Sequence, residues 1–127
     1  MVFEIAFPLR DRFPGLQVIV GHIEGVRVES TGADLKRFKE GVLGEVKRKY
    51  SLESLKDVVI FRTYRNFFWE IGIDPTKIRP AAEALVRRIL AGKPIPTINN
   101  VVDSYNLASI RLQIYPVILL IGHSDLQ

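Results

Sequence analysis

The sequence contains no cysteine and only two histidines among its 127 residues. Without thiols the chain can form no disulfide, no thiolate metal site and no thiol nucleophile. His22 and His123 lie in separate segments, and neither has a second ligand at the spacing of a metal-binding motif. The phosphate-binding patterns GxxxxGK[ST] and GxGxxG are absent as well. We therefore expect neither a metal nor an organic cofactor.

Long apolar runs are also missing. No uninterrupted segment approaches the ~20 apolar residues that a membrane-spanning helix requires. Residues 1–13 are interrupted by Pro8 and charged at Arg10, which is unlike a secretory signal peptide. We expect a cytoplasmic protein with no membrane partner.

Positive charge is in moderate excess, with 18 Lys and Arg against 14 Asp and Glu and a net charge of +4. The basic residues cluster in residues 36–49 and at Arg87 and Arg88. Such clusters attract phosphate backbones, although a solvated helix face explains any single cluster equally well. The length and the ordinary content of apolar and charged residues fit one globular domain over residues 1–127.

Hydrophobic periodicity predicts strands at the start of the chain and helices after them. Residues 2–7 are typical of a strand that ends at Pro8, and the Val and Ile content and partial alternation of residues 16–28 favour a longer strand. Capping and helical spacing favour helices over residues 31–50, 61–71, 80–90 and 99–112. In the helix over 80–90 we expect Glu83 and Arg87 to pair on the solvent side. In the helix over 61–71 the aromatic stripe is typical of a core, and Trp69 falls outside it.

The helix over residues 99–112 carries an unusual polar stripe. Val101, Tyr105, Ala108 and Leu112 converge on an apolar face, whereas Asn99, Asp103 and Asn106 lie opposite. Asn and Asp disfavour helix interiors, so a helix that accepts them on one stripe has a use for them. They could bind a ligand or hold the neighbouring loop of residues 94–100. The alternative is that Asn99 or Asn100 caps the helix and Asp103 completes a capping box.

The run from Tyr64 to Ile110 resembles a known family. Its matching elements are Tyr64-Arg65, Gly72-Ile73-Asp74-Pro75, Arg79-Pro80, the helix over 85–90, Pro96, and Asn99-Asn100-Val101-Val102-Asp103 with Asn106. The pattern is similar to the B-three/B-four domain of the phenylalanyl-tRNA synthetase beta chain, and closest to its free-standing version. The similarity covers roughly residues 61–110.

The resemblance implies a three-layer α/β fold with packed β-sheets and flanking helices. It also implies a partner, tRNA or aminoacyl-tRNA, because in the synthetase this domain hydrolyses tyrosine attached to the wrong tRNA. A pocket for an apolar side chain rejects an added hydroxyl only weakly, so a second hydrolytic site is needed. Carried over to this chain, the catalytic residues are Asn99, Asn100 and Asp103. The substrate-binding residues are Arg79, Asn106, Tyr64 and Arg65.

The chain departs from the family after Ile110, where the expected pattern degrades. We therefore expect an incomplete version of a longer domain, and a homo-oligomer joined along the apolar segment 116–122. Two functions remain open. One is hydrolysis in trans of mischarged aminoacyl-tRNA, and the other is a non-catalytic scaffold that binds tRNA or an amino acid.

Overall fold

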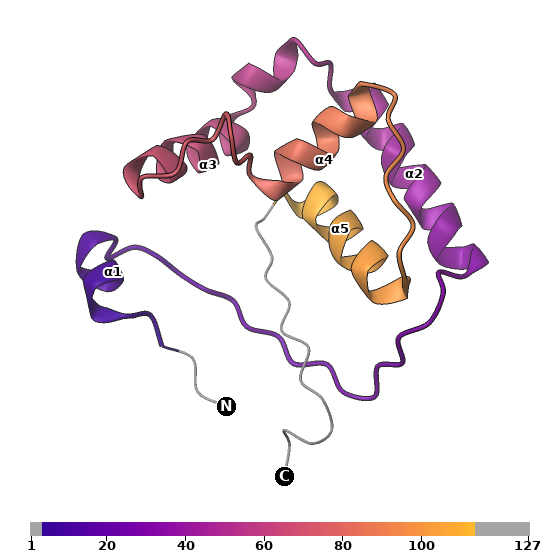
Figure 1. The fold of residues 1–127 in the computed structure, drawn as a ribbon, viewed down its shortest axis with the longest axis horizontal. Coiled ribbons are helices and arrows are strands. Elements are labelled where there is room, and N and C mark those ends of the chain that lie inside the picture. Colours follow the sequence, from indigo (N-terminus) through magenta and orange to yellow (C-terminus); the bar gives the residue numbers. More distant parts are fainter. Residues whose placement is uncertain (1–3, 114–127) are drawn as a thin grey trace.

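The computed structural model describes residues 4–113 of the chain. Within that range the regular elements follow in this order: α1 (Phe7–Arg12), α2 (Ala33–Lys49), the 3₁₀ helix η1 (Ser54–Asp57), α3 (Val59–Glu70), α4 (Ala81–Leu90) and α5 (Asn100–Leu112). Figure 1 shows α2, α4 and α5 packed together, with α3 beside the start of α4. Each helix predicted from the sequence is confirmed, to within two residues at either end.

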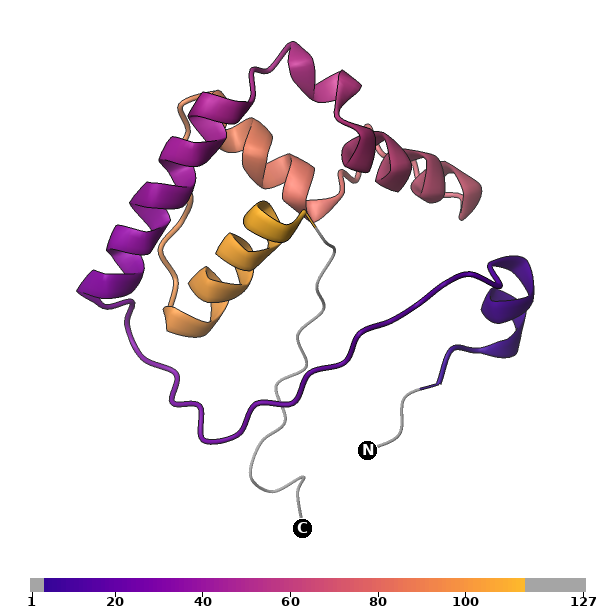
Figure 2. The same ribbon diagram turned by 180° about the vertical axis from the view of Figure 1, so that it is seen from behind.

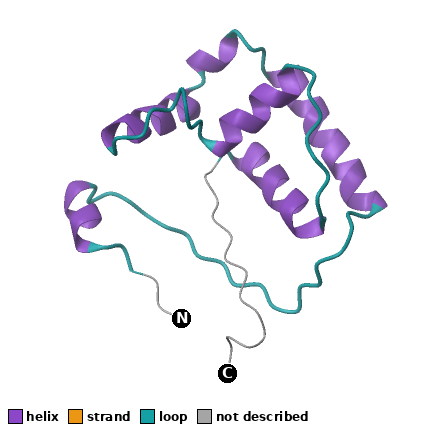
Figure 3. Ribbon diagram, in the orientation of Figure 1, coloured by secondary structure: helices purple, strands orange, loops and turns teal. Residues whose placement is uncertain are grey.

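The predicted α/β fold with packed sheets is wrong for the part of the chain that the structure describes. Residues 4–113 contain helices and loops and no strand (Figure 3). Where a strand over 2–7 was expected, Phe7 begins a helix, because Pro8 has a backbone angle suited to the first helical turn. The segment 116–122, through which we expected oligomers to form, lies outside the described residues.

Residues 13–32, which include the predicted strand over 16–28, run as an extended segment between α1 and α2 (Figures 1 and 2). The alternation of Val and Ile buries no face there, since Ile19 is 99% exposed and Ile23 80% exposed. A strand forms only when a second strand accepts and donates its backbone hydrogen bonds. The sequence pattern favours a strand, and no described strand lies alongside residues 16–28 to pair with them.

The core forms where α2, α4 and α5 meet in pairs. Its buried residues are Val42, Val46, Leu55, Phe61, Ala82, Val86, Ile89, Ile95, Leu107 and Ile110. Burying a side chain of the size of Ile89 or Leu107 contributes about 1.5–3 kcal/mol. Lys39 of α2 fixes the loop before α5, because its Nζ donates to the carbonyl of Ile95 at 2.7 Å and to the Thr97 hydroxyl at 3.1 Å.

Two helices end in the same glycine-based turn. Gly72 after α3 and Gly92 after α4 have φ of 82° and 73°, in the left-handed region that glycine adopts without strain. In the turn after α4, the amide of Gly92 donates to the Ile89 carbonyl and that of Lys93 to the Arg88 carbonyl, both at 3.0 Å. The turn therefore brings Lys93 back beside the last turn of α4.

Candidate functional site

The side chains of the two asparagines at the start of α5 form hydrogen bonds with backbone groups. The Oδ1 of Asn99 accepts from the Val102 amide at 2.8 Å, which makes Asn99 the N-cap of α5. Asn100 reaches the extended segment: its Oδ1 accepts from the Glu29 amide and its Nδ2 donates to the Arg27 carbonyl, each at 2.9 Å. The backbone N–H of Asn100 also donates to the Glu29 carbonyl at 2.9 Å. Asn100 thus satisfies the backbone of residues 27–29 much as a neighbouring strand would.

Asp103 points into the protein. Its side chain is 3% exposed, its Oδ1 accepts from the Ile98 amide at 3.0 Å, and its Oδ2 accepts from the Thr31 hydroxyl. Leu107 and Ile110, one and two turns further along α5, are buried as well, whereas Leu112 is 63% exposed. The expected apolar face of α5 was therefore wrong: the buried face is the one that carries Asp103.

These contacts bear on the two interpretations left open for the polar stripe. The side chains of Asn99, Asn100 and Asp103 hold α5 to the loop before it and to residues 27–31. That geometry supports the structural interpretation. The catalytic roles of these three residues stay a prediction.

The expected substrate-binding residues are divided among three elements. Tyr64 and Arg65 lie on α3 and are half-buried, Arg79 is exposed just before α4, and Asn106 is half-buried on α5. Arg65 and Arg79 both flank α4, whereas Asn106 belongs to a different helix. The structure thus places two of the predicted cations around α4.

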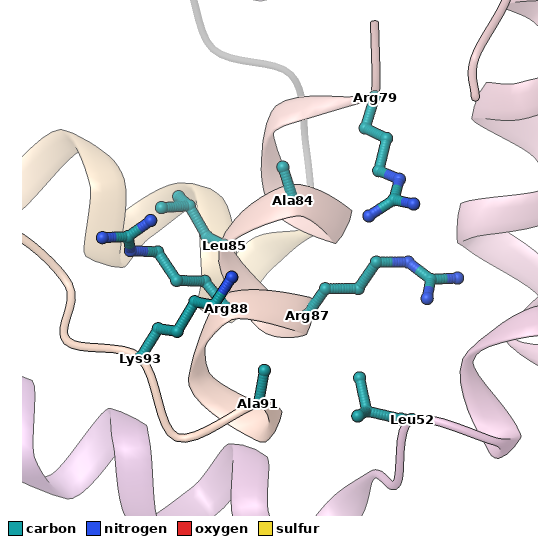
Figure 4. A pocket seen from close by; sticks show the side chains of 8 residues that line it. All are labelled: Leu52, Arg79, Ala84, Leu85, Arg87, Arg88, Ala91 and Lys93. Carbon is teal, nitrogen blue, oxygen red and sulfur yellow. The ribbon is translucent and has the colours of Figure 1, made fainter. Parts of the chain in front are cut away.

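An open depression of about 420 Å³ lies on the surface of α4. Its lining residues are Leu52, Arg79, Ala84, Leu85, Arg87, Arg88, Ala91 and Lys93. Four of these eight side chains are cationic and none is acidic. Figure 4 shows Arg79 and Arg87 extending to one side of α4, and Arg88 and Lys93 to the other. The Nε of Arg88 donates to the Pro94 carbonyl at 2.6 Å, which orients its guanidinium.

A buried ion network connects this depression to α3. Glu83 of α4 is fully buried, and its Oε1 accepts from the Nε of Arg87 at 2.8 Å while its Oε2 accepts from the Nε of Arg65 at 2.9 Å. A terminal amino group of Arg65 donates to Oε1 as well, so Arg65 binds the carboxylate in a bidentate manner. The two arginines are 29% and 23% exposed in their side chains. Two positive charges therefore meet one negative charge, and the network as a whole remains cationic.

Contacts within the network stabilise the charged forms of Glu83 and Arg65. Burial alone would raise the pKa of Glu83, but the hydrogen bonds and positive charges of Arg65 and Arg87 outweigh it, and the pKa is lowered. The hydrogen bond to Glu83 raises the pKa of Arg65. The expectation that Glu83 and Arg87 pair on the solvent side was thus half wrong, because the pair exists but Arg65 of α3 covers it.

Sequence reasoning overlooked Lys93 and did not connect Arg79 with Arg87 and Arg88. The available signal was the placement of cations before, within and after a single short helix whose one carboxylate, Glu83, is already paired. Among residues 4–113, no cluster of three His, Cys, Asp or Glu side chains is placed to hold a metal ion. None of the described helices has the length and apolar character needed to cross a membrane.

Comparison with protein-family models gives a match in the second half of the chain. The model of the B3/4 domain family matches residues 63–118, which agrees with the resemblance found in the sequence. No curated protein and no solved structure matches the chain. The matched residues carry α4, α5 and most of α3, so the similarity to the B3/4 domain family covers the second half of the described helices.

Proposed function

We propose that this chain binds tRNA through the cationic depression on α4. The observation that carries the proposal is the lining itself: Arg79, Arg87, Arg88 and Lys93 gather around one helix with no acidic side chain among them. Arginine and lysine contacts to phosphate supply most of the sequence-independent affinity for nucleic acid. The link to tRNA comes from the resemblance to the synthetase domain, whose family match covers α4 and α5.

Two arginines of the depression are held in place by hydrogen bonds. This favours the depression as the binding site over basic residues whose side chains have no such contacts. Arg87 is oriented by Glu83 and Arg88 by the Pro94 carbonyl. A guanidinium held in one orientation loses less side-chain entropy when it binds a phosphate. The basic residues of α2, such as Lys47 and Arg48, are exposed at the end of a helix and line no part of this depression.

Binding is tested by fluorescence anisotropy with labelled tRNA at several salt concentrations. The double variant Arg88→Ala/Lys93→Ala should weaken binding about tenfold and make the slope of log affinity against log salt shallower by roughly 1 to 2. The matched control Lys47→Ala/Arg48→Ala removes the same charge from α2. Equal losses in the two double variants would mean that net charge alone drives binding, and the depression would not be the site.

Hydrolysis of mischarged aminoacyl-tRNA is the second candidate, supported by the family match over α5. The contacts of Asn99, Asn100 and Asp103 favour binding without hydrolysis, because each of these side chains already has a partner that holds α5 in place. The assay is release of the amino acid from a panel of mischarged tRNAs. Release that Asn99→Ala or Asn100→Ala abolishes, in variants that still bind tRNA, would establish the hydrolytic function and overturn our preference.

A further inference from the structure

Trp69 is the only tryptophan of the chain, and its side chain is 57% exposed on the last turn of α3. We infer that its indole ring stacks on an unpaired base of the bound RNA, an inference that rests on the proposed function. An aromatic side chain next to a positively charged path is the arrangement by which proteins bind single-stranded nucleic acid. The position of Trp69 relative to the cations of α3 and α4 carries the argument.

Trp69 shares one side of α3 with two arginines. At about 100° per residue, Arg62, Arg65 and Trp69 fall within roughly 60° of one another around the helix axis. Phe61 and Phe68 mark the buried side of α3, being 1% and 7% exposed. The exposed indole therefore lies next to Arg65, on the solvent side of the contact between Arg65 and α4.

The end of α1 and the residue that follows it contact the opposite flank of α3. The rings of Phe13 and Phe67 are 5.1 Å apart, and Arg12 donates to the carbonyl of Glu70. Phe67 and Trp69 are about 160° apart on the helix. The contacts with α1 thus use the Phe67 side, and leave the indole of Trp69 open to a ligand. The exposed Glu70 follows Trp69 but points about 100° away from it, toward the α1 side.

Arg65 connects Trp69 to the depression. Arg65 and Arg87 bind the same oxygen of Glu83, so the guanidinium of Arg65 on α3 lies beside that of Arg87, which lines the depression. Phosphates that contact Arg87 and Arg65 would bring the next nucleotide toward Trp69. The internal bases of a duplex are stacked on both faces and cannot receive the indole, whereas the bases of an unpaired end or loop can.

The single tryptophan makes the test direct. Intrinsic fluorescence of Trp69 is recorded during titration with a single-stranded RNA oligonucleotide and with a duplex of equal length. Anisotropy of the labelled RNAs is measured in parallel. Stacking should quench the fluorescence with the single strand, and the duplex should bind with little quenching. Anisotropy that shows single-strand binding without any change in Trp69 fluorescence would overturn the inference and leave the proposed function standing.

Variants separate stacking from fold. Trp69→Ala should weaken single-strand binding about fivefold or more, and Trp69→Phe should restore most of it, because phenylalanine retains a face for the base. The matched control is Phe7→Ala, which removes another exposed ring, 74% exposed on α1. Equal affinities of the two alanine variants and the unmodified protein for the single strand would contradict the inference. If anisotropy detects no binding of any RNA, the proposed function itself fails.

Discussion

The hydroxyl of Thr31 donates a hydrogen bond to the buried carboxylate of Asp103, 72 positions further along the chain. Both side chains are almost fully buried, at 7% and 3% exposure. The contact joins Thr31, two residues before the start of α2, to the first turn of α5. A carboxylate is stable at such a site only when its oxygens accept hydrogen bonds, and the Ile98 amide supplies the second donor.

Replacing Asp103 by alanine should lower the free energy of unfolding by about 2–3 kcal/mol, because the Ile98 amide and the Thr31 hydroxyl lose their acceptor. Asp103→Asn keeps one acceptor oxygen and should cost about half as much. Urea denaturation followed by circular dichroism measures both. The control is Asn106→Ala on the same helix, where alanine improves helix propensity and the change should stay within about 0.5 kcal/mol. An Asp103→Ala protein as stable as the control would contradict the structural role.

Asn100→Ala should release residues 27–29 from α5 without unfolding the helices. The variant loses the side-chain hydrogen bonds to the Glu29 amide and the Arg27 carbonyl, and an extended segment held by few contacts opens locally. Trypsin should then cut after Arg27 several-fold faster than in the unmodified protein. Asn100→Asp keeps the acceptor for Glu29 but lacks the donor for Arg27, so its cleavage rate should be intermediate. An unchanged rate in Asn100→Ala would show that other contacts hold the segment.

Glu83→Gln should destabilise the protein by about 2–3 kcal/mol near neutral pH, because two partly buried arginines lose their counter-charge. The lowered pKa of Glu83 sets the pH dependence. A carboxylate whose pKa is lowered by folding contributes its full stability above its ordinary pKa of about 4.3, and loses that contribution as the pH falls toward the folded value. The difference in unfolding free energy between the two proteins should therefore be constant above about pH 5.5 and shrink below about pH 4.

Measurement of urea unfolding across that pH range checks the Glu83 prediction. The contributions of the other carboxylates to the pH dependence cancel in the difference between the two proteins. A difference that stays constant down to the acid end would mean that Glu83 is not paired as described. Glu40→Gln on the exposed side of α2 is the control, and it should show neither effect.

Gly92→Ala should cost about 1–2 kcal/mol, because the residue after α4 has φ of 73°, which strains any side chain. Gly41→Ala is the matched opposite case: Gly41 lies inside α2, and an added Cβ meets no atom within 4 Å. That substitution should stabilise the protein by about 0.5–1 kcal/mol. Thermal denaturation shows whether the first substitution lowers the stability and the second raises it. Similar effects in the two variants would refute the left-handed turn at Gly92.

The sequence predicts helices well in this chain because their signals are local. Gly72 and Gly92 end α3 and α4, and Asn99 is the N-cap of α5. Each of these features depends on atoms within one or two helical turns. The site was less predictable, because the depression on α4 gathers Arg79, Arg87, Arg88 and Lys93 with Leu52 from outside that helix.

Sequence alone therefore determined, to within two residues, where α2, α3, α4 and α5 begin and end, and which family model residues 63–118 match. The tertiary structure decided which helix faces are buried. The sequence pattern of each helix predicts that Glu83 and Asp103 face solvent, yet both are buried. Their partners, Arg65 and Thr31, lie 18 and 72 positions away in the sequence. It also decided that residues 16–28 form no strand among the described residues. Backbone pairing requires a second segment alongside, and no local pattern can supply one.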